Sequence, residues 1–167
     1  MKGELLEMSF NIEEKYLYNI DINDKFFDSL KEDYADFTKW FLRKSKEKKA
    51  AYITYNNGNI TSFCMYKLED EKEKYLSFSK PFLPKKRLKI STLKVSDRGK
   101  GIAKTYLEII MNKAKEYKCE EIYITLFDKH KELIRLLKDF GFMYYTFKYT
   151  TRFDGEVVKE SIYVKKI

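Results

Sequence analysis

Cysteine, proline and glycine are all scarce in this chain, which has two cysteines, two prolines and six glycines among 167 residues. Two cysteines without metal-ligand spacing exclude a disulfide framework and give no sign of a metal centre. No apolar run is long enough to span a bilayer, and the first residues lack the apolar core of a signal peptide. We therefore expect a cytoplasmic protein with reduced thiols and no membrane segment.

The same scarcity bears on domain organisation. No Pro/Gly/Ser-rich linker and no internal repeat divides the chain, so residues 1–167 are expected to form a single domain. The length suffices for a sizeable core, and the 44% of apolar residues is typical of a globular protein.

Aromatic residues and basic charge are abundant. The chain contains 14 tyrosines and 13 phenylalanines, and 34 basic against 26 acidic residues give a net charge of +8. Such a surface favours anionic partners such as nucleotides, nucleic acid or acidic lipid. A lysine-rich surface that is merely solvated is the alternative, and both interpretations stay open here.

Hydrophobic periodicity predicts strands and helices in alternation. Two glycine turns are expected to close hairpins, at Asn57-Gly58 and at Asp154-Gly155. Glu69 and the charged residues after it are expected to form a solvated turn. The predicted strands cover 14–22, 50–69 as a hairpin, 87–95, 120–127, 142–153 and 156–167, and the predicted helices cover 24–47, in one piece or two, 102–117 and 128–140. This order indicates an α/β (α+β) fold with helices on the faces of one sheet.

Two of the six glycines, Gly99 and Gly101, lie close together between a predicted strand and a predicted helix. Glycines at such a turn let backbone N–H groups approach a phosphate, and the helix N-terminus adds partial positive charge. Arg98, Lys100 and Lys104 add full charges. The spacing matches neither a phosphate-binding P-loop nor a dinucleotide fingerprint. The structural alternative is a tight turn at Gly99 with close helix packing at Gly101.

Residues 98–103 read Arg-Gly-Lys-Gly-Ile-Ala and match Arg/Gln-x-x-Gly-x-Gly/Ala. This pattern resembles the pyrophosphate-binding signature of the GNAT superfamily of acetyl-CoA-dependent N-acetyltransferases. The strand before it, the long helix after it and the later Gly141-Phe142 pair resemble that family too, over roughly residues 50–145. The resemblance implies a mixed, mostly antiparallel central sheet flanked by helices in a single domain.

The resemblance also implies a division of labour at the site. The backbone of Leu93, Lys94 and Val95 would pair with the pantetheine arm of CoA, and an N–H close to Leu93 would polarise the thioester carbonyl. The acceptor amine would attack the thioester directly, and preorganised backbone donors would stabilise the oxyanion. The pyrophosphate would be held by the backbone of Arg98, Gly99, Lys100, Gly101, Ile102 and Ala103.

The sequence departs from the family pattern before Gly141. Alignment on Gly141 places His130 where many members have an Asn, and Leu137 where many have a Tyr that protonates the leaving thiolate. His130, the only histidine, is expected either to contact CoA and shuttle a proton or to be an exposed residue of a helix start. Tyr144 and Tyr145 are candidates for the missing acid, and no carboxylate stands out as a base.

These features predict an N-acetyltransferase that uses acetyl-CoA as cosubstrate and a primary amine as acceptor. The amine could belong to a small molecule, a protein or aminoacyl-tRNA, and tRNA or another polyanion is a possible partner given the net charge. A catalytically weak CoA-binding module, associated with RNA or a regulatory partner, is the alternative that Leu137 favours. Monomer and homodimer both stay open.

Overall fold

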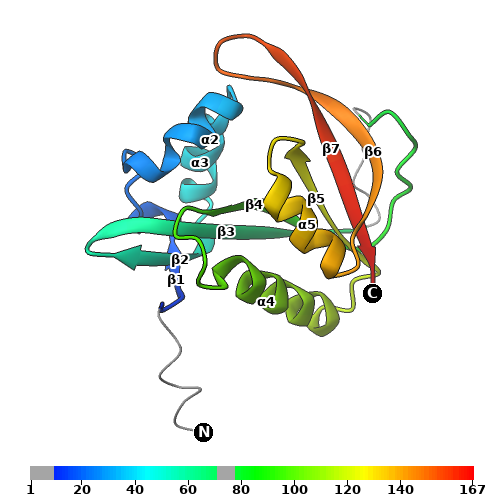
Figure 1. Ribbon diagram of the computed structural model, residues 1–167, viewed down its shortest axis with the longest axis horizontal. Coiled ribbons are helices and arrows are strands. Elements are labelled where there is room, and N and C mark those ends of the chain that lie inside the picture. Colours follow the sequence, from blue (N-terminus) through cyan, green and yellow to red (C-terminus); the bar gives the residue numbers. More distant parts are fainter. Residues whose placement is uncertain (1–9, 71–77) are drawn as a thin grey trace, which may run out of the picture.

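A seven-stranded sheet with helices on both faces forms the molecule, shown in Figure 1 as a computed structural model that describes residues 10–70 and 78–167. The strand order is β1-β2-β3-β4-β5-β7-β6. Of the strand pairs in the described ranges, β4 and β5 are parallel and the others are antiparallel. The mixed, mostly antiparallel sheet predicted from the sequence is confirmed.

Most predicted elements are present with small shifts of their ends. The strands are β1 (Glu13–Tyr16), β2 (Ala50–Asn56), β3 (Asn59–Glu69), β4 (Arg87–Val95), β5 (Glu121–Phe127), β6 (Met143–Thr151) and β7 (Val157–Lys166). The helices are α2 (Asp28–Asp33), α3 (Phe37–Lys46), α4 (Ile102–Glu116) and α5 (Lys131–Asp139), with the short 3-10 helices η1 (Leu17–Asn19) and η2 (Lys25–Phe27).

The strand predicted over 14–22 is too long, because β1 ends at Tyr16. The buried Leu17 starts η1, and its N–H donates to the Lys49 carbonyl at 2.9 Å. The chain therefore turns away from the sheet after four residues, and the Leu17 side chain packs in the core.

The helix predicted over 24–47 is broken in two. Asp24 caps its start as expected, accepting a hydrogen bond from the Phe26 N–H at 2.8 Å. Tyr34 has extended backbone angles between α2 and α3. The break leaves the Tyr34 ring stacked on Phe127 of β5, with the two ring centroids 5.3 Å apart.

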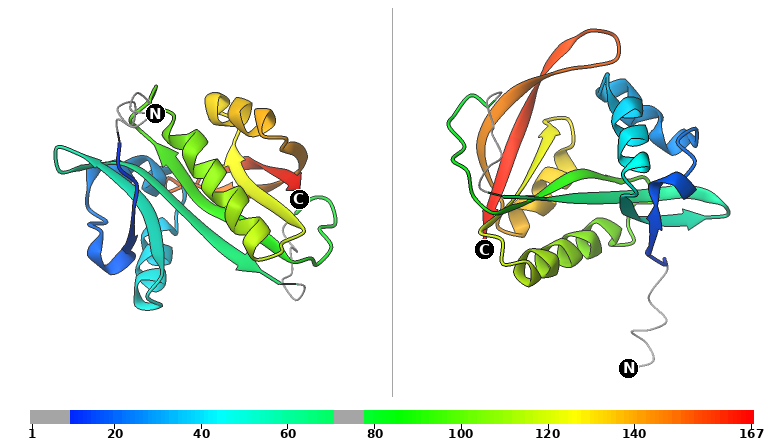
Figure 2. Two further views of the ribbon diagram at one scale, coloured as in Figure 1. Left: turned by 90° about the horizontal axis from the view of Figure 1, so that it is seen from below. Right: turned by 180° about the vertical axis from the view of Figure 1, so that it is seen from behind.

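Helices cover both faces of the sheet because side chains alternate along each strand. In β3, Phe63 and Met65 pack in a core cluster with α2 and α3, whereas Cys64 packs in the cluster beneath α4 and α5. Figures 1 and 2 show α2 and α3 on one side of this strand and α4 on the other. No helix within 10–70 and 78–167 has the length and apolar character that crossing a bilayer requires.

Candidate active site

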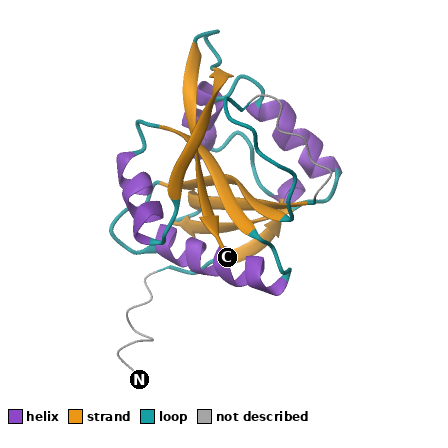
Figure 3. Ribbon diagram, turned by 90° about the vertical axis from the view of Figure 1, so that its right-hand side faces the viewer, coloured by secondary structure: helices purple, strands orange, loops and turns teal. Residues whose placement is uncertain are grey.

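The sheet opens where β4 and β5 diverge, which Figure 1 labels, and Figure 3 shows the strands and their flanking helices from the side. The two strands pair only from Arg87 to Ile90 of β4, so the edge of β4 that faces β5 is unpaired beyond Ile90. Pairing with β3 also shifts here, because Met65 lies opposite Thr92 and Tyr66 opposite Ile90. The shift marks a bulge at this point, and such bulges re-aim the backbone next to binding sites. The following residues thus present N–H and C=O groups that need a partner.

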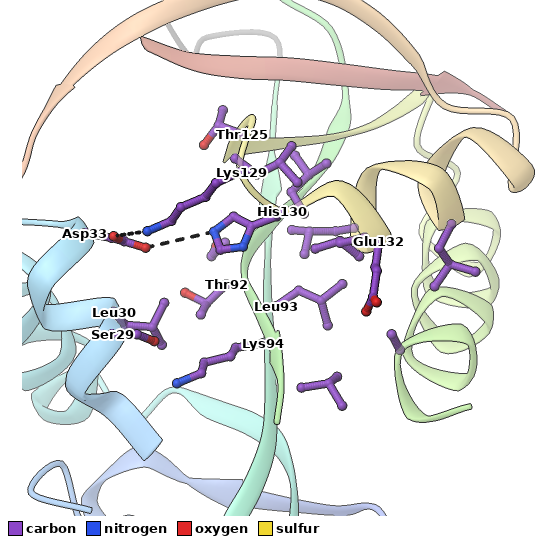
Figure 4. A pocket seen from close by; sticks show the side chains of 18 of the residues that line it. Ser29, Leu30, Asp33, Thr92, Leu93, Lys94, Thr125, Lys129, His130 and Glu132 are labelled. Atoms are coloured by element: carbon purple, nitrogen blue, oxygen red, sulfur yellow. Dashed lines mark hydrogen bonds and ion pairs between the residues drawn. The ribbon is translucent and has the colours of Figure 1, made fainter. Parts of the chain in front are cut away.

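A cavity of about 920 Å³ occupies this opening. Figure 4 shows part of its lining, with α2 on one side, β4 along the floor and the start of α5 on the other. The backbone-pairing residues predicted from the sequence, Leu93, Lys94 and Val95, all lie on it. Of the six predicted pyrophosphate residues, all except Lys100 also line it: Arg98, Gly99, Gly101, Ile102 and Ala103. The structure therefore brings these two predicted groups together on one cavity.

The glycine turn has room for a ligand. Gly99 and Gly101 have φ angles of +82° and +78°, and a Cβ atom added at either position would meet nothing within 4 Å. Backbone conformation, rather than the close helix packing considered for Gly101, therefore accounts for both glycines. Gly101 is the N-cap of α4, whose first N–H groups have no intrahelical partner.

The charged residues of this turn already have carboxylate partners. Arg98 pairs with Glu132 of α5 at 2.7 Å, and Lys100 pairs with Asp97 at 2.9 Å. The Arg98 and Glu132 side chains are about 70% exposed (73% and 70%), so this pair is weak and can yield to a phosphate.

His130 lies at the start of α5 and faces a buried acid on α2, as the dashed lines in Figure 4 mark. Its Nε2 atom is 3.9 Å from Oδ2 of Asp33, whose other oxygen accepts a 2.6 Å hydrogen bond from Lys129. Burial and the neighbouring Lys129 lower the His130 pKa, while Asp33 acts in the opposite direction. The imidazole is therefore neutral at pH 7 and able to accept a proton.

A second buried carboxylate, Glu160 of β7, joins four elements around the same cavity. It accepts hydrogen bonds from the hydroxyls of Tyr34 (2.7 Å), Thr125 (3.1 Å) and Thr150 (2.7 Å). Lys148 of β6 lies 3.8 Å from it. Burial and the Glu160 charge both raise the Tyr34 pKa. The Tyr34 hydroxyl therefore stays protonated and donates a hydrogen bond to Glu160.

Two lysines of β4 reach into the cavity. The Lys94 side chain donates to the Phe26 carbonyl and lies 4.4 Å from the centre of the Phe26 ring. Lys89 lies 5.9 Å from the centre of the Tyr123 ring. Burial lowers the pKa of both amines. These cations differ from the exposed lysines of the surface, because the protein removes them from much of their solvent.

The two tyrosines predicted as candidate acids lie away from this cavity. Tyr144 packs edge-on against Tyr163 and lines a separate, smaller hollow. Tyr145 packs against Phe82, and its hydroxyl donates to the Pro81 carbonyl. The register shift between Tyr144 and Thr146 changes which side chains of β6 face the cavity, and sequence spacing does not reveal such a shift.

The position of the family tyrosine is not open to the cavity either. The Leu137 side chain is fully buried in the core cluster beneath α4 and α5. Leu133 and Leu136 of the same helix line the cavity instead.

The expectation that Glu69 belongs to a solvated turn is wrong. Glu69 ends β3 and is 5% exposed, and it accepts a 2.6 Å hydrogen bond from the Tyr123 hydroxyl. Glu71 and the rest of that predicted turn lie outside the described residues, apart from Asp70. Ser91 and Thr92, noted as able to hold a water, do line the cavity.

Sequence reasoning missed Asp33, Tyr34, Lys89, Lys148 and Glu160 as residues of the site. The four charged residues occur in amphipathic patterns where a charge normally indicates the solvent face, and Tyr34 lies on the apolar face of the predicted helix. The nearest signal was the break that the sequence analysis allowed within 24–47, because the extended backbone of Tyr34 is visible only in the structure.

Comparison with known proteins identifies the family. Residues 14–142 match the model of the acetyltransferase (GNAT) family. The chain is 31% identical over 135 residues to a spermine/spermidine N(1)-acetyltransferase of Bacillus subtilis (strain 168), covering 75% of this chain and 79% of the relative. A probable spermine N(1)-acetyltransferase of Bacillus subtilis subsp. natto (strain BEST195) shows the same values.

A solved structure shares the fold. It is a ribosomal-protein-alanine N-acetyltransferase from Brucella melitensis, with a TM-score of 0.63 and 15% identity, covering 94% of this chain and 99% of that one. The chain therefore belongs to the GNAT family of acetyltransferases, enzymes that take their acetyl group from acetyl-CoA.

Proposed function

We propose that this enzyme transfers the acetyl group of acetyl-CoA to a primary amine by direct attack of the amine on the thioester. The observation that carries the proposal is the meeting of the unpaired β4 edge and the open glycine turn on one cavity. The β4 edge supplies backbone partners for the amide groups of the pantetheine arm, and the glycine turn supplies N–H groups for the pyrophosphate.

In this proposal the pantetheine arm pairs with the backbone of Leu93, Lys94 and Val95. The pyrophosphate binds the N–H groups of 98–103, with Arg98 released from Glu132 to meet it. His130 contacts the arm where it passes the start of α5. An N–H close to Leu93, next to the shifted β3–β4 register, stabilises the oxyanion without reorganisation.

The chemical step proceeds through a tetrahedral intermediate. The amine nitrogen forms a bond to the carbonyl carbon, the carbonyl oxygen becomes the oxyanion, and the carbon–sulfur bond then breaks to release the CoA thiolate. The amine proton passes to neutral His130, directly or through water. Because a thiol has a pKa of about 8.5, the thiolate can leave without protonation by a tyrosine at the position of Leu137.

Binding of acetyl-CoA at the turn is tested by Gly101→Glu. Glutamate at φ +78° strains the turn, and its carboxylate repels a pyrophosphate, so we expect CoA affinity to fall by about 100-fold or more. Calorimetric titration of wild type and variant measures this. Gly155→Glu, in the exposed β6–β7 turn at φ +88°, is the matched control and keeps full affinity. Equal affinity in Gly101→Glu and wild type refutes the placement.

Transfer itself is tested by thiol release from acetyl-CoA over a panel of amines. The names of the curated relatives make spermine and spermidine the first acceptors to try. If CoA binds tightly and no amine, peptide or charged tRNA releases thiol, the catalytically weak CoA-binding module takes the place of the enzyme proposed here. The buried, apolar Leu137 is the observation that favours this second candidate.

A further inference from the structure

The cavity extends past the glycine turn to an inner end between α2, β4 and the β6–β7 hairpin. Backbone hydrogen bonds close this end, because Ala35 N–H donates to Thr151 at 3.1 Å and Phe153 N–H donates to Glu32 at 3.0 Å. The amine of the acceptor must reach the thioester from this side, so the charges here select the acceptor.

The two buried acids of the inner end are already neutralised, whereas Asp36, which also lines the cavity, is exposed. Asp33 has Lys129 at 2.6 Å and Arg152 at 3.6 Å. Glu160 accepts hydrogen bonds from three hydroxyls and has Lys148 at 3.8 Å. Neither carboxylate is left to pair with a cationic acceptor.

Lys89, in contrast, has no carboxylate in direct contact within the described ranges. It lines the cavity, and its ammonium makes no hydrogen bond and no ion pair at 4 Å or less there. Burial and Lys148 oppose its charge, and Glu69 and Glu160 favour it only from beyond ion-pair distance. A partly buried cation without a directly paired counter-ion is costly to hold, and a bound anion relieves that cost.

We infer that the acceptor amine carries an anionic group, a carboxylate or a phosphate, which binds Lys89 with Lys148 beside it. The inference rests on the function proposed above and names its substrate class. A polyamine would bring a second cation to a lysine that has no directly paired carboxylate in the described part of the chain. An amino acid or an amino phosphate supplies that counter-ion and still presents a primary amine to the thioester.

Four probes with short aliphatic chains separate the classes: 4-aminobutyrate, 2-aminoethyl phosphate, butylamine and 1,4-diaminobutane. Each is titrated into the CoA-loaded protein by calorimetry, so that binding is read without turnover. We expect one or both anionic probes to bind at least about 10-fold more tightly than the neutral and dicationic amines. The stronger of the two identifies the anion as carboxylate or phosphate.

Two substitutions test the role of Lys89. Lys89→Glu should reverse the order, so that 1,4-diaminobutane binds more tightly than 4-aminobutyrate, and Lys89→Gln should abolish the preference without adding a carboxylate. Lys115→Glu, on the exposed side of α4, changes the net charge equally and should leave the order unchanged.

The outcomes distinguish this inference from the proposed function. Equal or tighter binding of butylamine or 1,4-diaminobutane to wild type overturns the inference, as does unchanged selectivity in both Lys89 variants or no binding of either anionic probe. Thiol release from acetyl-CoA is measured separately. Spermidine turnover without anion selectivity would uphold the transferase and overturn the inference, whereas anion selectivity without turnover of any amine would contradict the transferase alone.

Discussion

His130 has two features beyond what contact with CoA requires. Its ring faces a buried carboxylate on another element, and burial with the adjacent Lys129 lowers its pKa. A contact with the pantetheine arm requires only a hydrogen-bonding side chain, which asparagine also supplies. A neutral imidazole beside the cavity adds the ability to accept the amine proton.

Substitution of His130 by Asn and by Ala separates these two roles. The wild-type rate should fall as pH falls through the His130 pKa, which lies below the ordinary value for histidine, because protonation removes the acceptor lone pair. His130→Asn should retain CoA affinity but lose this limb of the pH profile and about 10²–10⁴ in rate at pH 7.5. His130→Ala should lose affinity as well. A pH profile of His130→Asn that matches wild type excludes proton transfer by this residue.

At the scale of elements, the break between α2 and α3 depends on a contact far away in sequence. The Tyr34 hydroxyl reaches Glu160 of β7, 126 residues further along the chain. Thr125 and Thr150 bind the same carboxylate, so β5, β6 and β7 share one anchor with the α2–α3 corner. This anchor sets the width of the inner end of the cavity.

Removal of the Tyr34 hydroxyl should therefore lower the stability of the fold. A hydrogen bond to a charged group contributes about 1.5–3 kcal/mol, and we expect Tyr34→Phe to lower the free energy of unfolding by that amount. Tyr149→Phe is the control, because Tyr149 is 65% exposed on β6. Denaturant unfolding of the three proteins checks this. A loss below about 0.5 kcal/mol in Tyr34→Phe would show that Glu160 finds another donor.

For the whole molecule, the excess of basic charge extends beyond the cavity. A second hollow of about 420 Å³ lies between α5 and β7 and is bordered by Lys131, Arg135, Lys138 and Lys159. The prediction of a tRNA or other polyanion partner stays open, and this hollow is a surface where such a partner would meet four cations.

Filter binding of tRNA at two salt concentrations tests that prediction. Binding by surface cations releases counterions, so affinity should fall about 10-fold or more between 50 and 200 mM salt. The double variant Arg135→Glu/Lys138→Glu should weaken binding further at 50 mM. Exposed Arg43 and Lys46 of α3 provide a charge-matched control on another face. Absence of tRNA retention at 50 mM would confine the anion preference to small ligands.

The sequence by itself determined the elements and the glycine turn. Helical and strand periodicities are local, and turn glycines such as Gly58 and Gly155 need their positive φ whatever surrounds them. The order of charge, glycine and helix at 98–103 likewise places N–H groups at a helix start without any distant contact.

Only the tertiary structure decided which side chains share the cavity. β7 lies between β5 and β6, so Glu160 meets Tyr34 and Thr125, and no local pattern encodes that insertion. A one-residue register shift in a strand changes the face that each later side chain occupies. For this reason sequence spacing could not predict that Tyr145 packs against Phe82 and Phe78. The same sheet geometry leaves Lys89 in the cavity without an ion pair at 4 Å or less among residues 10–70 and 78–167, because ion pairing depends on distances that only the folded chain defines.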